Sequence, residues 1–176
     1  NRLISAKSQA IDITAWSTEL NAFNETMSYD DNGNIKTLQR NQRQHEWMTT
    51  EAAYTSQMID DLTYVYENSN QNNLLRNVDD DASIPGGFAN GSTSTSAQEY
   101  IHDDAGNITK DDNKQITNIT YNILGKAAQV TLAGGKTLQY TYDAAGNKLK
   151  MVFTDGASST TDYIGGFVYE NAALKY

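Results

Sequence analysis

The sequence predicts an all-β protein built from antiparallel hairpins, and three observations support this fold class. Tyr, Thr, Ile and Val, which favour half-buried strands, are common, and proline occurs only at Pro85. Apolar and polar residues alternate along several segments. Asn, Asp and Gly recur between these segments as turn residues. The 176 residues therefore fit a single segment of hairpin repeats over 1–176, an extended antiparallel sheet with at most one short helix.

Strands are clearest in the C-terminal half, where apolar residues alternate with a period of two. Three predicted apolar faces consist of Ile119, Tyr121 and Ile123; of Leu138, Tyr140 and Tyr142; and of Leu149, Met151 and Phe153. Glycines in 133–136 and the pair Asp155-Gly156 tolerate the positive φ that tight hairpin turns require. We expect one hairpin at each of these two turns.

A short motif recurs along the chain: Tyr, Asp, two variable residues, Gly, Asn and then an aliphatic residue within two places. Complete copies begin at Tyr29 and Tyr142, a third has His102 in the Tyr place, and weaker copies begin at Tyr66 and Tyr121. We expect Tyr to end a strand with its ring on the packed face, Asp to cap the turn, Gly to take the left-handed conformation and Asn to steady the bend. In the Tyr66 copy, Asn70 is expected to replace Gly. The predicted structural residues are Tyr29, Asp30, Gly33, Asn34, Tyr66, His102, Asp103, Gly106, Asn107, Tyr121, Gly125, Tyr142, Asp143, Gly146 and Asn147.

Two stretches, 41–58 and 79–98, interrupt the repeats and are predicted to be insertions or loops. Within 44–60, intervals of seven and four separate Trp47, Tyr54 and Met58, a spacing that could form one face of a short helix. The stretch 79–98 begins with three aspartates and continues through Gly-Gly and alternating Ser and Thr, which is typical of a mobile loop.

The motif copies, the stretch 107–122 and the closing stretch 162–171 resemble Rhs/YD-repeat proteins, in particular bacterial members of the Bacteroides type. In that family the repeats build a large curved β-sheet shell around a hollow interior, often with a toxic C-terminal domain inside. The resemblance implies that this chain is a wall segment and that 162–176 begins the family's core-like region. It also implies a secreted or cell-envelope location in a bacterium, and partners that are further repeats and a C-terminal domain of the same polypeptide.

The resemblance does not extend to the family's self-cleaving motif. That motif has an Asp-Pro-x-Gly signature, and the only proline here is in Ile84-Pro85-Gly86-Gly87. No protease activity is implied, and we expect no enzyme activity.

Charge and cysteine content exclude several other classes. A net charge of -9 argues against nucleic-acid binding, which requires several clustered cations; Lys148 and Lys150 alternate along one strand as a solvated face would. No segment pairs a basic face with an apolar helical face, so we expect no membrane insertion. The absence of cysteine excludes disulfides and thiolate metal sites.

We also expect no cofactor, metal or catalytic residues. Asp30, Asn32 and Asn34 imitate the start of a calcium loop, but Gly33 stands in the fourth place rather than the sixth, and Asn41 stands where the twelfth-place Glu belongs. The acidic runs 79–81 and 111–112 could hold a hard cation, although such runs are usually solvated. His45 and His102 are too far apart in sequence to suggest zinc. A two-carboxylate glycosidase stays open, because the separation of its carboxylates is a property of the folded chain.

Two function classes follow. The favoured one is a structural wall segment. The alternative is an adhesion module that binds carbohydrate or protein on a cell surface through the stacking surfaces of Trp16, Trp47, Tyr54 and Tyr100. Exposed rings would favour adhesion, and rings packed between hairpins would favour the wall. Open strand edges also predict weak self-association.

Overall fold

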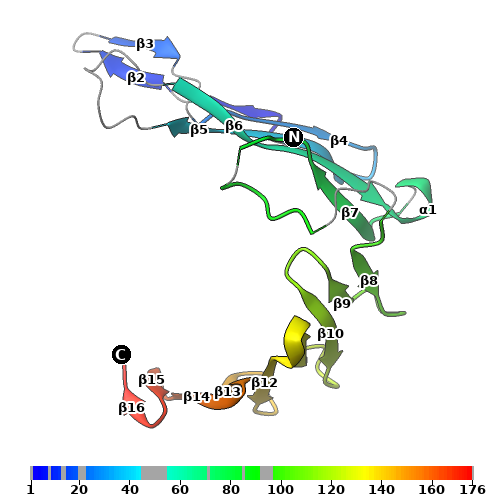
Figure 1. Cartoon of the computed structure of the whole chain (residues 1–176), viewed down its shortest axis with the longest axis vertical. Helices are drawn as coiled ribbons and strands as arrows, with labels where there is room; N and C mark the ends of the chain where they lie inside the picture. Colours follow the sequence, from blue (N-terminus) through cyan, green and yellow to red (C-terminus); the bar gives the residue numbers. More distant parts are fainter. Residues whose placement is uncertain are drawn as a thin grey trace. The chain divides into compact units, whose positions relative to one another are not determined.

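The computed structural model describes residues 2–7, 9–12, 15–19, 23–44, 55–70, 72–84, 86–91 and 97–175. These residues form two compact units, Asn1–Gln98 and Glu99–Tyr176. Nearly all of their regular structure is strand, paired in antiparallel fashion (Figure 1). The predicted fold class, antiparallel hairpins with at most one short helix, is confirmed, whereas the assignment of the chain to a single segment stays a prediction.

The first unit is a five-stranded sheet in the order β1-β4-β5-β6-β7 beside a two-stranded sheet of β2 and β3. Its strands are β1 (Ser5–Ala6), β2 (Gln9–Asp12), β3 (Ala15–Glu19), β4 (Glu25–Tyr29), β5 (Ile35–Gln44), β6 (Thr55–Tyr66) and β7 (Leu75–Asp80). A single turn, α1 (Glu67–Asn70), separates β6 from β7.

The short helix expected within 44–60 is wrong where it can be compared with the structure. Gln44 ends β5, and the residues from Thr55 onward begin β6, which pairs with β5 in antiparallel register. Trp47 and Tyr54 lie outside the described residues. The strand continues because β5 and β6 satisfy each other's backbone donors and acceptors over a long hairpin.

The core of the first unit lies around β6. Its buried apolar side chains are Ile59, Leu62, Tyr66 and Val78. A bulge explains why Ile59 and Asp60, neighbours in sequence, are both buried: Asp60 pairs with Arg40 and Met58 pairs with Asn41, which leaves Ile59 as the extra residue.

The stretch predicted as a mobile loop is partly docked on this sheet. Asp79 and Asp80 complete β7, and no strand follows among the described residues until Tyr100. The backbone N–H of Phe88 donates to Asp60 at 2.5 Å, and the side-chain amide of Asn90 donates to Asp79 at 2.9 Å. A Cβ on Gly87 would overlap the Ile59 carbonyl oxygen, so only glycine permits this approach. Pro85 and residues 92–96 lie outside the described residues.

The second unit is one nine-stranded meander in which each strand pairs with its neighbours in sequence. Its strands are β8 (Tyr100–His102), β9 (Ile108–Asp111), β10 (Ile116–Tyr121), β11 (Ala127–Leu132), β12 (Thr137–Tyr142), β13 (Lys148–Asp155), β14 (Ala157–Ile164), β15 (Phe167–Glu170) and β16 (Ala173–Leu174). The 3₁₀ turn η1 (Ala133–Gly135) joins β11 to β12, and Gly156 joins β13 to β14, as predicted.

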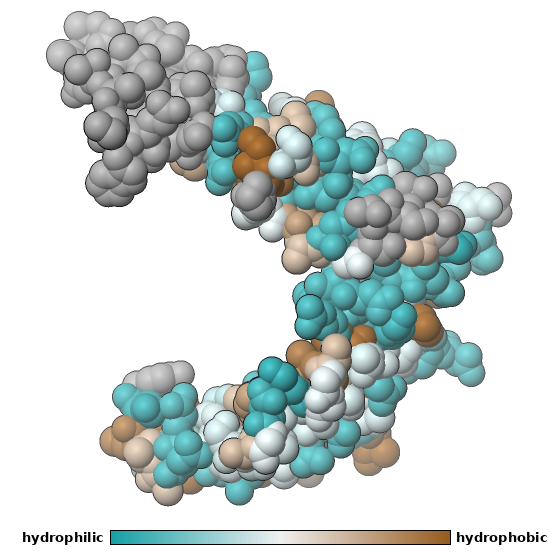
Figure 2. Space-filling view, in the orientation of Figure 1, coloured by the Kyte–Doolittle hydropathy of each residue, from teal (hydrophilic) through white to brown (hydrophobic). Residues whose placement is uncertain are grey.

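The two faces of this sheet differ in chemistry. Val130, Leu138 and Phe153 are opposite one another on adjacent strands and form the centre of an apolar face. Thr131, Thr137 and Thr154 form the matching row on a polar face. Only Val130 of the apolar row is buried, so most of that face is half-exposed. The view in Figure 2 is correspondingly mixed, with small apolar patches between hydrophilic and intermediate areas.

Two residues that were expected on apolar strand faces lie elsewhere. Ile123 is in a turn and is fully exposed, because β10 ends at Tyr121. Leu149 is 43% exposed, because Tyr142 pairs with Lys148 and Thr141 with Lys150, which leaves Leu149 as a bulge.

Candidate functional site

The best-defined side-chain arrangement in the molecule is the turn of the repeat motif. In the copies that begin at Tyr29, His102 and Tyr142, the Asp backbone N–H donates to the Asn carbonyl oxygen, and the Gly N–H donates to the Asp carbonyl oxygen, at 2.9 to 3.1 Å. The Asp carboxylate then accepts the Asn backbone N–H at 2.8 Å and the Asn side-chain amide at 2.8 to 3.2 Å. The three Asp–Asn pairs are Asp30–Asn34, Asp103–Asn107 and Asp143–Asn147.

These bonds stabilise the ionised carboxylate. At Asp103 and Asp143 the side-chain amide of the paired Asn is the largest cause and lowers the pKa below the ordinary aspartate value. At Asp30 desolvation is the largest single influence and raises the pKa, but the combined bonds from Asn34 and the turn backbone outweigh it, so the pKa is lowered. The ionised carboxylate of each motif Asp therefore stabilises its turn through these hydrogen bonds.

The Gly of each of four copies has the left-handed conformation, with φ of +96° at Gly33, +84° at Gly106, +68° at Gly125 and +83° at Gly146. The copy that begins at Tyr66 has a longer loop before β7, with positive φ at Asn68 (+51°) and Ser69 (+56°). In the Tyr121 copy, Asn122 replaces Asp and its side-chain oxygen accepts the N–H groups of Leu124 and Lys126.

The Tyr of each copy contacts the preceding hairpin through its hydroxyl group, which the sequence did not predict. Tyr66 donates to the Ile35 carbonyl at 2.9 Å, Tyr121 to Ile108 at 2.6 Å and Tyr142 to Ala127 at 3.1 Å. Each acceptor lies six residues after the Tyr or His that opens the preceding copy. Tyr29 makes a similar bond to Leu3 at 2.8 Å. We call this series the tyrosine ties.

Two of the tied hydroxyls, those of Tyr66 and Tyr121, are stabilised in the protonated, donating form. Burial raises the pKa of Tyr66 and of Tyr121, and the carboxylates of Asp30 and Asp103 in the preceding turns raise them further. His102 occupies the register position of a motif Tyr, because it pairs with Ile108 as Tyr29 pairs with Ile35.

A bulge lies beside the Tyr or His of each motif copy. On the strand after the turn, one extra residue separates the partner of the motif Tyr or His from the next paired residue. The extra residues are Lys36, Arg76, Thr109, Ala128 and Leu149. These bulges could not be predicted from the sequence, because the alternation of apolar and polar residues does not reveal which residue is left unpaired.

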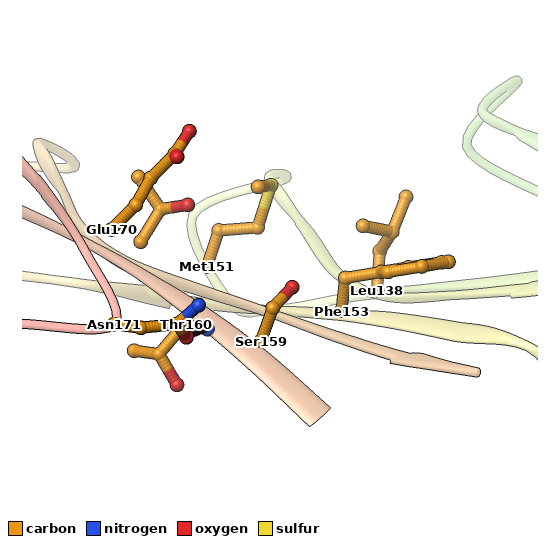
Figure 3. Close-up of a pocket in the computed structure, with 8 residues that line it drawn as sticks. Leu138, Met151, Phe153, Ser159, Thr160, Glu170 and Asn171 are labelled. Atoms are coloured by element: carbon orange, nitrogen blue, oxygen red, sulfur yellow. Dashed lines mark hydrogen bonds between the residues drawn. The ribbon is translucent and has the colours of Figure 1, made fainter. Parts of the chain in front are cut away.

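A groove of about 310 Å³ lies on the apolar face of the second unit (Figure 3). Leu138, Met151 and Phe153 form its apolar side, and its other lining residues are Ser159, Thr160, Thr161, Glu170 and Asn171. Glu170 is the one ionisable side chain in this lining. The groove is a half-open sheet surface with an apolar side and a hydroxyl-rich side.

A second hollow of about 260 Å³ lies in the first unit beside the docked loop. Arg40 and Asp60 form an ion pair at 2.5 Å there, with Asp60 buried and Arg40 about half-exposed. The buried Asp60 carboxylate is thus neutralised by the Arg40 guanidinium and also accepts a hydrogen bond from the Phe88 N–H.

The acidic runs considered as cation sites are engaged with protein donors. Asp80 accepts the N–H groups of Asp61 and Ala82, and Asp111 forms an ion pair with Lys114 at 3.2 Å. Within the described part of the chain, no group of three or more His, Asp or Glu side chains is arranged to hold a metal.

Of the four aromatic residues proposed as stacking surfaces, only Tyr100 has a described side chain, and it is 7% exposed. The side chain of Trp16 and all of Trp47 and Tyr54 lie outside the described residues. Among the residues that can be examined, no helix is long and apolar enough to cross a membrane.

Comparison with known proteins agrees with the repeat geometry. Residues 121–160, which contain the last two motif copies, match the family model "RHS Repeat". No curated protein matches the chain. Among solved structures, the chain is similar to one in "Crystal Structure of TcdB2-TccC3-Cdc42", with 15% sequence identity and a TM-score of 0.45. That match covers 85% of this chain and 9% of the other. Residues 121–160 are therefore an Rhs repeat, and the motif turns at Asp30 and Asp103, outside this stretch, have the same hydrogen bonds as the turn at Asp143 within it.

Proposed function

We propose that this chain is a wall segment of a hollow β-sheet container, secreted or at the surface of a bacterium, that encloses or presents a C-terminal effector domain of the same polypeptide. The observation that supports this most directly is the series of tyrosine ties. Each tie joins one hairpin to the hairpin before it, so the motif continues a sheet from repeat to repeat.

The motif side chains are used for structure rather than chemistry. The Asp carboxylates and Asn amides bond to each other across the turn, and the Tyr hydroxyls donate to backbone carbonyls. An enzyme site would need acids, bases or nucleophiles that face a substrate instead.

The repeated bulge supports a curved wall. An extra residue in one strand bends that strand and increases the local twist. Because the bulge recurs at the same place in successive repeats of the second unit, the bends add along the sheet.

The difference between the two faces also suits a wall, since one side would face a cargo and the other solvent. Adjacent strands place apolar side chains on one face and Thr and Gln side chains on the other. A sheet in open solution would gain little from such a half-exposed apolar face.

The test uses the full-length parent protein with single cysteines introduced on opposite faces of the second unit. Ser159, opposite Phe153, reports the apolar face, and Thr141, opposite Lys150, reports the polar face. Both side chains are exposed in this chain, which has no cysteine of its own; cysteines elsewhere in the parent would be replaced first. Each variant is treated with a small maleimide and with a polymer-linked maleimide too large to pass through a wall.

We expect Ser159→Cys and Thr141→Cys both to react with the small reagent, and only one of them to react with the large reagent. Unfolding the protein should restore the large reagent's reaction at the protected position. Equal reaction of both positions with the large reagent in the folded protein would contradict an enclosing wall and would favour an open adhesion module.

A further inference from the structure

We propose that Asn32 is a site of spontaneous deamidation, at which this chain acquires an aspartate or isoaspartate within the first repeat turn. This inference is independent of the container function, because it rests on one turn. Asn32 precedes Gly33 in the sequence, and glycine has no side chain to hinder attack by its own backbone nitrogen.

The reaction needs only water. The Gly33 nitrogen attacks the Asn32 side-chain carbonyl carbon, a C–N bond forms, and the side-chain amide leaves as ammonia, carrying away the proton lost from the Gly33 nitrogen. Water then opens the resulting succinimide at either carbonyl. One opening gives an aspartate in the normal backbone, and the other gives an isoaspartyl linkage in which the chain passes through the former side chain.

The turn leaves the Asn32 side chain accessible. Asn32 is exposed, in the second of the two variable places of the motif, whereas Asp30 and Asn34 form the bonds that hold the turn. The Gly33 N–H donates to the Asp30 carbonyl at 3.1 Å, so that bond must open before attack. It is a single bond at the surface of a turn, where local opening has a low free-energy cost.

Of the four copies that have a motif Gly, only the first has Asn directly before it. Leu124, Ala105 and Ala145 precede the glycine in the others. These residues have no side-chain amide, so the same turn geometry cannot react there.

The chain provides its own comparison in Asn90-Gly91. The Asn90 side-chain amide donates to Asp79 at 2.9 Å, and Asp79 is 9% exposed. Before its carbonyl carbon can be attacked, Asn90 must release this charge-assisted bond and leave a half-buried position. The folded structure should therefore protect Asn90 and leave Asn32 reactive.

Isoaspartate at position 32 would add one backbone atom to a turn whose bonds fix the register of β4 and β5. It would also place a new negative charge beside Asp30 and Asp31. Met27 pairs with Leu38 near the turn, and this pairing must adjust if the turn lengthens.

The experiment incubates the 176-residue chain at mildly alkaline pH and follows both Asn-Gly peptides by mass spectrometry, in which each deamidation adds about 1 Da. We expect the Asn32 peptide to convert about tenfold faster than the Asn90 peptide in the folded protein, the factor that corresponds to one strong side-chain hydrogen bond. In urea the two rates should become similar.

Asn32→Ala, which copies the residue found at Ala105 and Ala145, is the matched control and should abolish conversion of the first peptide. Separation of isoaspartyl from aspartyl peptides should show both products at position 32. Equal rates for Asn32 and Asn90 in the folded protein, or a folded-state rate at Asn32 below that at Asn90, would overturn the proposal.

Discussion

Exchanging residues at left-handed turn positions of the second unit should change its stability in opposite directions. Gln115 has φ of +56° and Gly146 has φ of +83°. Both donate their N–H groups to the carbonyl of the Asp three residues earlier, Asp112 and Asp143 respectively. Both positions therefore share this hydrogen bond and a left-handed backbone, but only Gly146 has the residue type suited to that conformation.

The expected magnitude follows from two opposing effects. A residue with a side chain loses about 1–2 kcal/mol in the left-handed conformation. Glycine loses about 0.4–1 kcal/mol more conformational entropy on folding than alanine does. Gln115→Gly should therefore stabilise the unit by about 0.5–1 kcal/mol, and Gly146→Ala should destabilise it by a similar amount.

Urea unfolding monitored by circular dichroism measures both changes, with an unchanged dependence on denaturant as the check that the unfolding transition is the same. Gly125→Ala is the control: φ is +68° there, and an added Cβ has no heavy atom within 4 Å, whereas at Gly146 it would lie 2.8 Å from Lys126 Cε. Equal losses of unfolding free energy in Gly125→Ala and Gly146→Ala would show that the cost comes from the left-handed backbone rather than from contact with Lys126. A destabilising Gln115→Gly, or a neutral Gly146→Ala, would refute the reasoning.

Three further predictions concern single contacts. Tyr142→Phe removes one tie and should cost about 1 kcal/mol in urea unfolding, whereas Tyr140→Phe on the same strand should cost less; equal costs would show that the tie contributes nothing specific. Gly87→Ala places a Cβ against the Ile59 carbonyl oxygen, so we expect it to undock the loop and increase proteolysis between β7 and β8; an unchanged cleavage pattern would count against docking. Because the folded pKa of Asp103 and of Asp143 is lowered, their stabilisation is present above the unfolded pKa and is lost as the pH falls through the folded value; Asp143→Asn should weaken this acid dependence of the unfolding midpoint, and an identical pH profile would contradict it.

The repeat turns could be predicted from the sequence because their interactions are local. Asp143, Gly146 and Asn147 lie within five residues, and each has a conformational or hydrogen-bonding preference that defines the turn without help from the rest of the chain. The hairpins at η1 and Gly156 were predictable for the same reason. The Tyr66 copy has a longer loop with positive φ at Asn68 and Ser69, a difference that the motif spacing does not reveal.

Features that depend on distant residues were not predictable. The tie from Tyr142 has its acceptor at Ala127, and a backbone carbonyl leaves no mark in the sequence. The bulge at Leu149 shifts the alternation by one residue, which a period of two cannot reveal. The loop after β7 has the composition of a mobile segment, yet it docks because Asp60, on another strand, accepts the Phe88 N–H.

The same geometry explains why the variable places of the motif can accept a residue that damages the turn. Ala144 and Ala145 are exposed, as are Asp31 and Asn32, because the bonds that define the turn come from the places on either side. The stability of the turn therefore depends very little on which residue precedes the glycine. It follows that Ala145→Asn should leave the unfolding free energy of the second unit nearly unchanged and still create a second deamidation site. If Ala145→Asn instead stayed unmodified while Asn32 reacted, the reactivity of Asn32 would depend on its wider surroundings rather than on the repeat turn itself.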